Sequence, residues 1–320
     1  MKAALIGTWH VHAEAYAREF TSDPRCELAA VWDPDMEKAE AFVKQFGGKA
    51  FDDIDKLYAE AEFDSVMICS ATNEHVPLIV RAAEEGKHIF TEKVLALTTK
   101  GAEEIRDAVV KAGVKFTISY THKANPGLTF AKKAVESGKL GEITYARVRN
   151  AHNGSLAGWL PPHFYDKEQC GGGAMMDLGA HPMYTLLWLV GEPESVTSTF
   201  TTVTGKPVED NAVSVLRFAN GAIGVSETGF VSGCGNYVLE LIGTKGGVRI
   251  VDDQTAISED NGPWQVVPMP EEDKDPIFHW IDDVIDGIPA SEFGIDEAVR
   301  LTRLMEAAYI SHEEGRSAAY

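Results

Sequence analysis

A carboxylate and an imidazole in this sequence are spaced for joint proton chemistry. Asp177 and His181 occur within Cys170–Pro193, which reads CGGGAMMDLGAHPMYTLLWLVGEP. Residues four apart on a helix share a face, and a carboxylate beside an imidazole can orient it as a general base. The alternative is a surface ion pair. Apolar neighbours such as Met176 and Leu186 instead predict a largely buried helix, where Asp and His need partners.

A lysine follows a short strand pattern in the first half of the chain. His88–Thr91, HIFT, is followed directly by Glu92 and Lys93. A lysine at the carboxyl end of a strand, facing a cofactor pocket, can stabilise an alkoxide or polarise a carbonyl. Most lysines are solvated surface residues, so the position of Lys93 alone is a weak indication.

The segment Ala4–Phe20, ALIGTWHVHAEAYAREF, begins like a nucleotide-binding turn. The expected G-x-G-x-x-G pattern fails after its first glycine, because Trp9 and His12 occupy the second and third positions. If the indole of Trp9 turns outward, backbone N–H groups and the helix N-terminus remain able to bind phosphate, with His10 and His12 as donors. Since a helix begins here, the two histidines are not expected to converge on a metal, and no metal site is predicted. The candidate cofactor-binding residues of this loop are Gly7, Thr8, Trp9, His10 and Val11.

An acidic residue ends the second predicted strand, Glu27–Trp32. Asp33 lies 21 positions beyond His12, where a carboxylate can bind ribose hydroxyls and repel a 2′-phosphate, favouring NAD over NADP. Asp33 followed by Pro34 is also a good helix-capping pair, and this alternative stays open. Asp35 is expected to be a solvated carboxylate in the first helical turn.

Another candidate cofactor-binding segment directly follows the predicted buried strand Ser65–Cys69. Cofactors bind at the carboxyl ends of strands in open parallel sheets, whereas local spacing alone favours a helix start capped by Thr72 or Asn73. The candidate cofactor-binding residues here are Ser70, Ala71, Thr72, Asn73 and His75, together with Glu92 and Lys93.

The elements that would position these residues fall into two groups. In the first, strands alternate with helices, which predicts right-handed βαβ units and a Rossmann-type parallel sheet. Strands are expected at Lys2–Ile6, Glu27–Trp32, Ser65–Cys69, His88–Thr91 and Lys115–Tyr120, and helices at Val11–Phe20, 34–46, His75–Glu85 and Thr99–Ala112.

In the second group, consecutive strands with tight turns such as Ala219-Asn220-Gly221 predict an antiparallel or mixed sheet. Strands are expected at Ile143–Val148, Val196–Val203, Ala212–Phe218, Ala222–Phe230, Tyr237–Gly243 and Gly246–Val251, and helices at Pro126–Ser137, Ile277–Asp286 and Asp296–Glu314. The fold class is therefore α/β, with domains at 1–121 and 122–320.

Chain length, net charge and cysteine spacing limit the classes of binding partner and the cellular setting expected for this protein. A chain of 320 residues suits two domains, and a net charge of −20 disfavours nucleic acids and anionic membranes. The apolar run in MKAALIG is too short for a signal peptide, and no run approaches a membrane span. The four cysteines are widely spaced without a C-x-x-C pair, so we expect a reduced, cytoplasmic setting.

Together these motifs resemble the Gfo/Idh/MocA oxidoreductase family. The nucleotide-binding start, the strand-end Asp, Glu-Lys after a strand and G-G-G-A-x-x-D-x-G-x-H occur in the family's order. VEDNAVSVLRFANGAIGVSE, LIGTKGGVRI and AAYISHEEGRS are similar too, so the resemblance covers essentially the whole chain. It implies a Rossmann domain, a second α/β domain with a large, mostly antiparallel sheet, and NAD(P)-dependent redox chemistry on sugars or polyols. It also implies a homodimer or homotetramer joined through that sheet.

The resemblance assigns catalytic roles to Lys93, Asp177 and His181. His181 would exchange the hydroxyl proton, Lys93 would stabilise the alkoxide, and Asp177 would orient His181 or the substrate hydroxyl. Two departures concern the site. Val94 replaces the family's proline, which is expected to loosen the turn, and SYTHKANP offers Tyr120, His122 and Lys123 where an arginine is common.

Aromatic and polar side chains in AHNGSLAGWLPPHFYD suit a carbohydrate, which presents both C–H faces and hydroxyls. Packing within a loop is the alternative for each. The candidate substrate-binding residues are Lys93, Tyr120, His122, His152, Trp159, His163, Asp177 and His181.

Three functions stay open at this point. The first is an NAD-dependent sugar or polyol dehydrogenase, with NADP less favoured. The second is an enzyme that recycles NAD within one turnover and cleaves a glycosidic bond by transient oxidation and elimination. The third is a non-catalytic family member, which the substitution of Trp9 for glycine keeps open.

Overall fold

The computed structural model describes residues 1–251, 254–269 and 274–320, and the chain divides into two compact units. The first comprises Met1–Ser119 with Lys274–Val299, and the second comprises Tyr120–Asp273 with Arg300–Tyr320. No helix within the described residues is long and apolar enough to cross a membrane.

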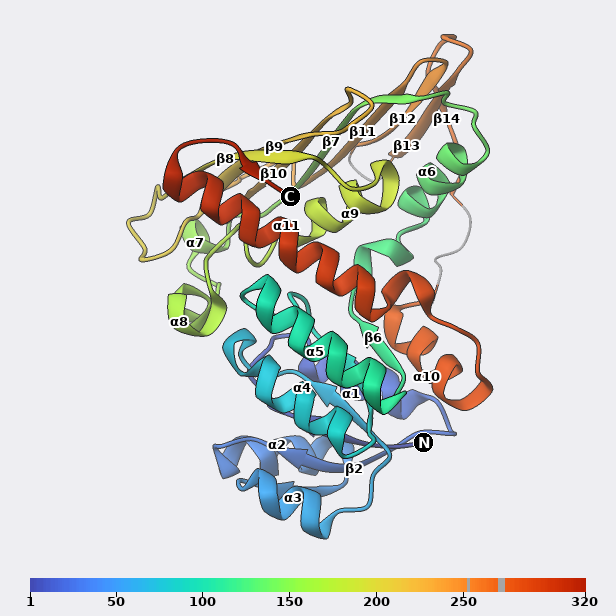
Figure 1. The fold of residues 1–320 in the computed structure, drawn as a ribbon. Helices are drawn as coiled ribbons and strands as arrows, with labels where there is room; N and C mark the ends of the chain where they lie inside the picture. Colours follow the sequence, from blue (N-terminus) through green and yellow to red (C-terminus); the bar gives the residue numbers. More distant parts are fainter. Residues whose placement is uncertain (252–253, 270–273) are drawn as a thin grey trace. The chain divides into compact units, whose positions relative to one another are not determined.

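The first unit is built on a six-stranded parallel sheet in the order β3-β2-β1-β4-β5-β6 (Figure 1). This is the strand order of a Rossmann fold, which reverses direction between β1 and β4. The strands are β1 (Lys2–Ile6), β2 (Glu27–Trp32), β3 (Lys49–Phe51), β4 (Ser65–Ile68), β5 (His88–Thr91) and β6 (Phe116–Ile118). The helices are α1 (Ala13–Ser22), α2 (Met36–Phe46), α3 (Ile54–Glu60), α4 (His75–Glu84), α5 (Thr99–Ala112) and α10 (Pro276–Asp286), with short 3₁₀ turns η1 (Thr72–Glu74) and η4 (Ser291–Phe293).

Helix α10 returns from the far end of the sequence to this unit. Its Trp280 is fully buried between Phe20 of α1 and Phe90 of β5, with ring centroids 5.9 and 5.5 Å away. A boundary at residue 121 therefore separates the strands correctly but assigns 274–299 to the wrong unit. The amphipathic pattern of α10 indicates that one face of the helix is buried against an apolar surface. The pattern does not indicate which unit supplies that surface.

Two helices of this unit begin later than predicted, and a side-chain cap explains one of the two shifts. Helix α2 begins at Met36 because the Asp35 carboxylate accepts a hydrogen bond from the Glu37 N–H. Asp35 is thus the cap, and the alternative that Asp33 caps this helix is wrong. Helix α1 begins at Ala13 and not at Val11, so His10 and His12 lie in the turn before it.

The second unit is built on a nine-stranded mixed sheet in the order β14-β13-β12-β11-β7-β10-β9-β8-β15. All its neighbouring strands pair antiparallel except β7 and β10. The strands are β7 (Ile143–Ala151), β8 (Ser195–Thr201), β9 (Asn211–Arg217), β10 (Ile223–Gly229), β11 (Tyr237–Gly243), β12 (Gly246–Val251), β13 (Gln254–Glu259), β14 (Gln265–Val266) and β15 (Ala318–Ala319). The helices are α6 (Pro126–Glu136), α7 (Gly154–Ala157), α8 (Lys167–Cys170), α9 (Ala180–Val190) and α11 (Ile295–Glu314), which begins in the first unit, with η2 (Thr121–Ala124) and η3 (Pro162–Tyr165).

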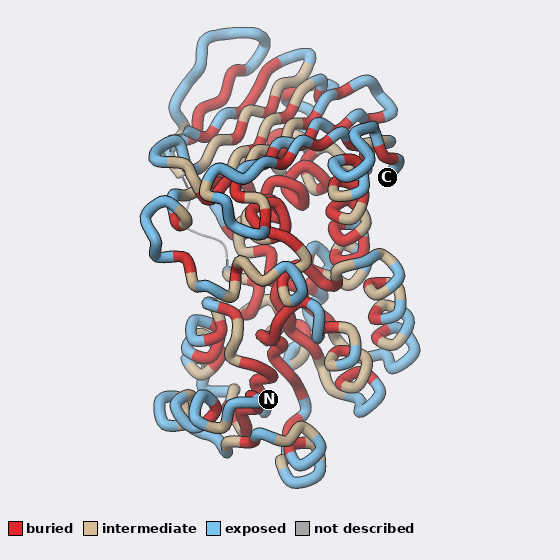
Figure 2. The backbone as a smooth tube through the Cα atoms, turned by 90° about the vertical axis from the view of Figure 1, so that its left-hand side faces the viewer, coloured by how far each residue is buried: buried red, intermediate tan, exposed pale blue. Residues whose placement is uncertain are grey.

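Burial alternates along these strands, as Figure 2 shows. Helix α9 covers β7 and β10 on one face, and α6 packs against β12. The opposite face carries residues that stay accessible, such as Val213 and Val215 of β9. Alternation of this kind is expected for a sheet with one covered and one open face.

The segment before α9 is a turn, which corrects the predicted helix through Asp177. Helix α9 begins at Ala180, so His181 lies in its first turn and Asp177 precedes it. The Gly179 N–H bonds the carbonyl of Ala174, five residues back, which interrupts regular helical spacing. Shared helical geometry therefore does not relate Asp177 to His181.

Candidate functional site

The carboxyl ends of β1 and β4 approach closely in the first unit. Gly7 follows β1 with φ of +82°, and a Cβ there would lie 2.7 Å from the Cα of Ser70, just after β4. Any side chain at Gly7 would push these loops apart. They meet where the strand order reverses, which is where open α/β sheets bind ligands.

Asp33 is buried at the end of β2 and is 4% exposed. Its Oδ2 accepts hydrogen bonds from the Thr8 N–H at 2.9 Å and the Thr8 hydroxyl at 2.6 Å, and its Oδ1 accepts one from the Asp35 N–H at 3.0 Å. The carboxylate thus connects the β1 and β2 loops and keeps acceptor capacity, since a carboxylate offers about four lone-pair sites.

Glu92 is the centre of a buried polar cluster beneath the β1–α1 turn. Its Oε1 lies 2.8 Å from His12 Nδ1 and 3.3 Å from His10 Nδ1. The Tyr16 hydroxyl donates to the same oxygen and lies 2.7 Å from Ser119 Oγ, while Glu92 Oε2 accepts from the Lys93 N–H at 2.9 Å.

The charges of this cluster determine its protonation. Burial raises the pKa of the Glu92 carboxyl. The charges of His10 and His12 and the hydrogen bond from His12 lower this pKa by more than burial raises it. With Lys93 acting in the same direction, the pKa of Glu92 lies far below its usual range. Burial, followed by the Glu92 charge, raises the pKa of Tyr16 well above its usual value. Tyr16 is therefore a permanent donor to an ionised carboxylate.

The two histidines converge, contrary to the expectation from the sequence. Ligand-type atoms of His10, His12 and Glu92 all lie within 4.8 Å of one another. The turn before Ala13 lets alternate residues point the same way, which a helix start at Val11 would prevent. His10 Nδ1 also lies 3.2 Å from the His12 N–H. The absence of a metal stays a prediction.

Lys93 is buried, 5% exposed, and a histidine holds the loop that follows it. His75 Nδ1 lies 3.1 and 3.2 Å from the carbonyls of Val94 and Leu95, and its Nε2 lies 3.3 Å from the carbonyl of Ser70. Burial lowers the pKa of His75 despite these contacts. Val94 is thus buried beside His75, and the looser turn expected from it stays a prediction.

The remaining cofactor candidates of the first unit divide by exposure. Ser70, Ala71 and Thr72 are buried, Asn73 and Val11 are exposed, and Trp9 lies between. Neither Thr72 nor Asn73 caps a helix, since Ala71 and Glu74 precede η1 and α4 without a side-chain capping bond. The capping alternative for this segment is wrong.

In the second unit, His181 is buried and oriented by aromatic side chains. Its Nδ1 lies 2.8 Å from the Tyr184 hydroxyl, which also accepts the His122 N–H at 3.0 Å. The rings of His122 and His181 stack with centroids 4.1 Å apart, and Tyr120 stacks on Tyr184 at 4.3 Å. Tyr120 and His122, both predicted from the sequence, thus join His181 in one cluster.

Two further residues adjoin this cluster, and only Lys123 is named from the sequence. Tyr237 packs edge-on against His122, with centroids 5.4 Å apart, and its buried hydroxyl has no hydrogen-bond partner within the described part of the chain. Burial raises the pKa of Tyr237 well above its usual range, so the phenol is neutral. Lys123, also buried, lies over the rings of Tyr120 and Trp188.

The predicted substrate-binding residues His152 and Trp159 belong to a separate aromatic group. His152 lies between Phe230, at 5.1 Å, and Trp159, at 4.6 Å, and Trp159 is 55% exposed. Burial lowers the pKa of His152, while the charge of Asp177 acts in the opposite direction. His163, in the segment that follows Trp159, packs on Phe164 with ring centroids 4.8 Å apart.

Comparisons with known proteins agree with this architecture. Residues 1–120 match the sequence model of an oxidoreductase family with an NAD-binding Rossmann fold, and residues 128–249 match the GFO/IDH/MocA C-terminal domain.

Named relatives include dehydrogenases. The chain is 27% identical to the D-glucoside 3-dehydrogenase of Escherichia coli, covering 72% of this chain and 70% of that protein. It is 27% identical to the scyllo-inositol 2-dehydrogenase (NAD(+)) of Bacillus subtilis, covering 78% and 73%. A solved levoglucosan dehydrogenase in complex with NADH and levoglucosan has the same fold, with a TM-score of 0.89, 21% identity and coverage of 100% and 99%.

Proposed function

Since the chain belongs to the Gfo/Idh/MocA family of NAD-binding oxidoreductases, we propose that it transfers hydride between NAD and a hydroxyl-bearing carbon of a sugar, polyol or sugar derivative. The substrate class follows from relatives that oxidise glucosides and inositols. The observation that carries the proposal is the buried His181, whose Nδ1 lies 2.8 Å from the Tyr184 hydroxyl, because this contact fixes the orientation and the tautomer of the imidazole.

The first unit has the features that NAD requires. Gly7 gives the close backbone approach at the strand-order reversal, and Asp33 places a buried negative charge where a 2′-phosphate would be repelled. Ser70 and the adjacent β4 loop border the same strand ends. We therefore assign NAD, with NADP disfavoured, to the carboxyl ends of β1, β2 and β4.

The chain's own residues supply the acid–base chemistry. NAD supplies the hydride acceptor when bound. In oxidation, His181 removes the hydroxyl proton at Nε2, which requires its Nδ1–H to donate to the Tyr184 oxygen. Lys93 stabilises the alkoxide charge, and Asp177 orients His181 or the substrate hydroxyl.

Substrate contacts are assigned to the second unit. The neutral Tyr237 hydroxyl can bind a substrate oxygen, and the exposed indole of Trp159, tilted against His152, can face the C–H surface of a sugar ring. His163 remains a candidate substrate-binding residue, because it lies close in the sequence to Trp159.

We also propose that two copies pair through the open face of the nine-stranded sheet. Apolar side chains there are 40–47% exposed, namely Val213, Val215, Ile223 and Val251. Beside them, Arg147 bonds Glu227 at 2.8 Å and Glu240 at 3.1 Å, and Arg149 bonds Glu227 at 3.4 Å, so two arginines balance two carboxylates within the face. A partly apolar, charge-neutralised sheet face is suited to a homodimer.

Calorimetric titration with NAD(H) and NADP(H) tests the cofactor assignment, and NADH absorbance with a panel of polyols and sugars tests the reaction. We expect NAD to bind more tightly than NADP. The His181→Ala and Lys93→Ala variants should lose turnover by about 10²-fold or more while keeping NAD affinity.

Three results would contradict the proposal. Failure to bind either dinucleotide would remove the enzymatic function. Near-wild-type turnover of His181→Ala would remove its role as the base. Cleavage of a glycoside without net NADH would replace simple dehydrogenation with an oxidation–elimination route.

A further inference from the structure

The glycine turn that leads to Asp177 packs against helix α11. A Cβ on Gly172 would lie 1.9 Å from the Tyr309 hydroxyl oxygen, so only glycine allows this approach. The glycines of GGGA thus bring the backbone against one particular side chain.

Glu209 binds the N–H groups of this turn. Its Oε1 accepts hydrogen bonds from the Gly173 N–H at 2.9 Å and the Met175 N–H at 3.0 Å. Its main-chain carbonyl accepts a third, from the Ala174 N–H at 2.8 Å. One residue therefore binds three consecutive amides, an arrangement that stabilises a carboxylate at the start of a helical turn.

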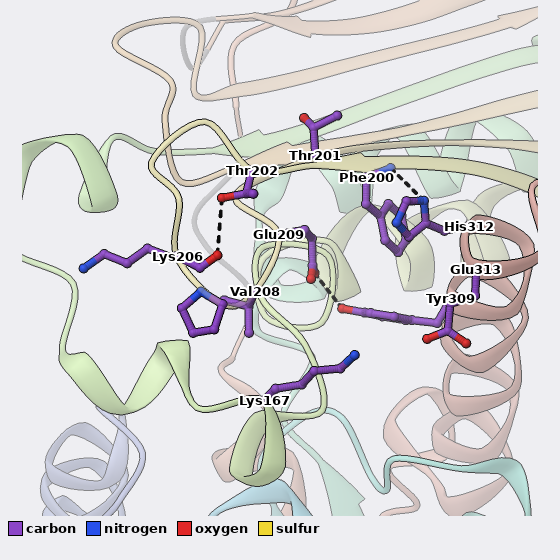
Figure 3. A pocket seen from close by; sticks show the side chains of 11 residues that line it. Lys167, Phe200, Thr201, Thr202, Lys206, Val208, Glu209, Tyr309, His312 and Glu313 are labelled. Atoms are coloured by element: carbon purple, nitrogen blue, oxygen red, sulfur yellow. Dashed lines mark hydrogen bonds between the residues drawn. The ribbon is translucent and has the colours of Figure 1, made fainter.

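Tyr309 of α11 holds Glu209 in place. Its hydroxyl donates to the same Oε1 at 2.6 Å, as Figure 3 shows. Burial, followed by the charge of Glu209, raises the pKa of Tyr309 well above its usual value, so the phenol keeps its proton. The pair lines a cavity of about 290 Å³, whose mouth carries exposed residues such as Lys167 and Glu313.

The amides held by Glu209 begin the segment that ends at the proposed catalytic residues. The Gly173 carbonyl accepts the Asp177 N–H at 3.0 Å, and the Ala174 carbonyl accepts the Gly179 N–H at 2.9 Å. The buried Thr228 hydroxyl also donates to the Ala174 carbonyl, at 3.3 Å. Movement of residues 173–175 would therefore displace Asp177 and the first turn of α9.

The neighbouring carboxylate has a different task. Asp210 accepts the N–H groups of Val203 at 2.7 Å and Thr204 at 2.8 Å, and so holds the β8–β9 loop. Two adjacent acids at the start of β9 thus fix separate segments, and only Glu209 reaches the glycine turn.

We propose that Glu209, held by Tyr309, is a positioning residue that sets the geometry of Asp177 and His181 by binding the amides of the glycine turn. This inference rests on the proposed function for its catalytic consequence, and not for the contact itself.

The experiment compares five variants of the full chain: Glu209→Ala, Glu209→Gln, Tyr309→Phe, the double variant of Glu209→Ala with Tyr309→Phe and, as control, Glu313→Gln. The control removes the same charge from an exposed carboxylate on the rim of the same cavity. Amide hydrogen exchange of residues 171–181 is measured first, because it needs no substrate. Then kcat, KM and NAD affinity are measured.

For Glu209→Ala we expect exchange in 171–181 to become about tenfold faster or more, and kcat to fall about 100-fold with NAD affinity unchanged. Glu209→Gln keeps an acceptor oxygen and should recover most of kcat. Tyr309→Phe should have an intermediate effect, and combining it with Glu209→Ala should add little, because both act through one contact. Glu313→Gln should match the wild type.

The outcomes separate the two claims. Unchanged exchange in Glu209→Ala would overturn the contact. Faster exchange with unchanged kcat, or equal losses in the Ala and Gln variants, would overturn the positioning role. Faster exchange in a protein whose wild type shows no NAD-dependent activity would refute the proposed function and leave the structural role of Glu209 standing.

Discussion

The buried Glu92 cluster makes a prediction that needs no knowledge of the substrate. Replacing Glu92 by Gln removes the negative charge opposite His10 and His12. It also replaces one carboxylate oxygen by an amide N–H₂ group, which cannot accept a hydrogen bond from the donors that face Glu92 in the wild type. Tyr16 and the Lys93 N–H compete for the single remaining acceptor oxygen.

The magnitude follows from the burial of these contacts. Hydrogen bonds to a charged group contribute ~1.5–3 kcal/mol each, and removing one partner of a buried ion pair costs ~3–5 kcal/mol. We therefore expect Glu92→Gln to lower the free energy of unfolding by ~3–5 kcal/mol near neutral pH, a large part of a typical ~5–15 kcal/mol.

The effect should depend on pH in a defined direction. The folded-state pKa of Glu92 is depressed, so its contribution is complete above the unfolded-state pKa of about 4.3 and is lost as the pH falls below it. The difference between wild type and Glu92→Gln should therefore persist from pH 7 down to about 4.3 and shrink as the pH falls further.

Urea unfolding at several pH values measures this difference, with Glu84→Gln, an exposed carboxylate at the end of α4, as the matched control. The control should stay within ~0.5 kcal/mol of wild type. A Glu92→Gln protein of equal stability, or a difference that grows as the pH falls below about 4.3, would refute the ionised cluster.

Three further outcomes follow from the structure. Tyr184→Phe removes the oxygen that orients His181, so kcat should fall about 5–10-fold, the equivalent of a hydrogen bond of ~1–1.4 kcal/mol, and an unchanged kcat would exclude that contact from catalysis. Trp9→Gly restores the second glycine, and calorimetry should show altered NAD affinity; unchanged cofactor and substrate affinities would mean that the indole only fills space. Val215→Asp places a charge on the open sheet face and should shift sedimentation toward monomer, whereas an undisturbed assembly would place the interface elsewhere.

Most of the fold can be predicted from the sequence, because local patterns carry it. The apolar strands and the glycine- and proline-bounded helices indicate the alternating first unit, and β1, β2, β5, β11 and β12 occur with the predicted limits. The three-residue β3 is not recognised, because three residues are too few to show a period, and the seven-residue helix α3 is not recognised either. Strands β13, β14 and β15 are also not predicted from the sequence, and they are identified in the structure by their pairing with β12, β13 and β8.

Part of the candidate site can also be read from the sequence. Gly7 and Asp33 are identified by their distance from strand ends, and Lys93, Asp177 and His181 by a pattern that resembles a family. These are constraints that a short stretch of chain expresses by itself: a required φ, a strand register, a spacing between reactive groups.

What surrounds those residues is decided only by tertiary structure. The partners of Glu92 are His12, 80 positions away, and Tyr16, 76 positions away, and Tyr309 reaches Glu209 across 100 positions. Such pairs form because a buried charge must find donors wherever the packed chain brings them, and no local period records that search. The sequence by itself determined which groups can do the chemistry, and the tertiary structure decided which of them are buried, paired and held in place.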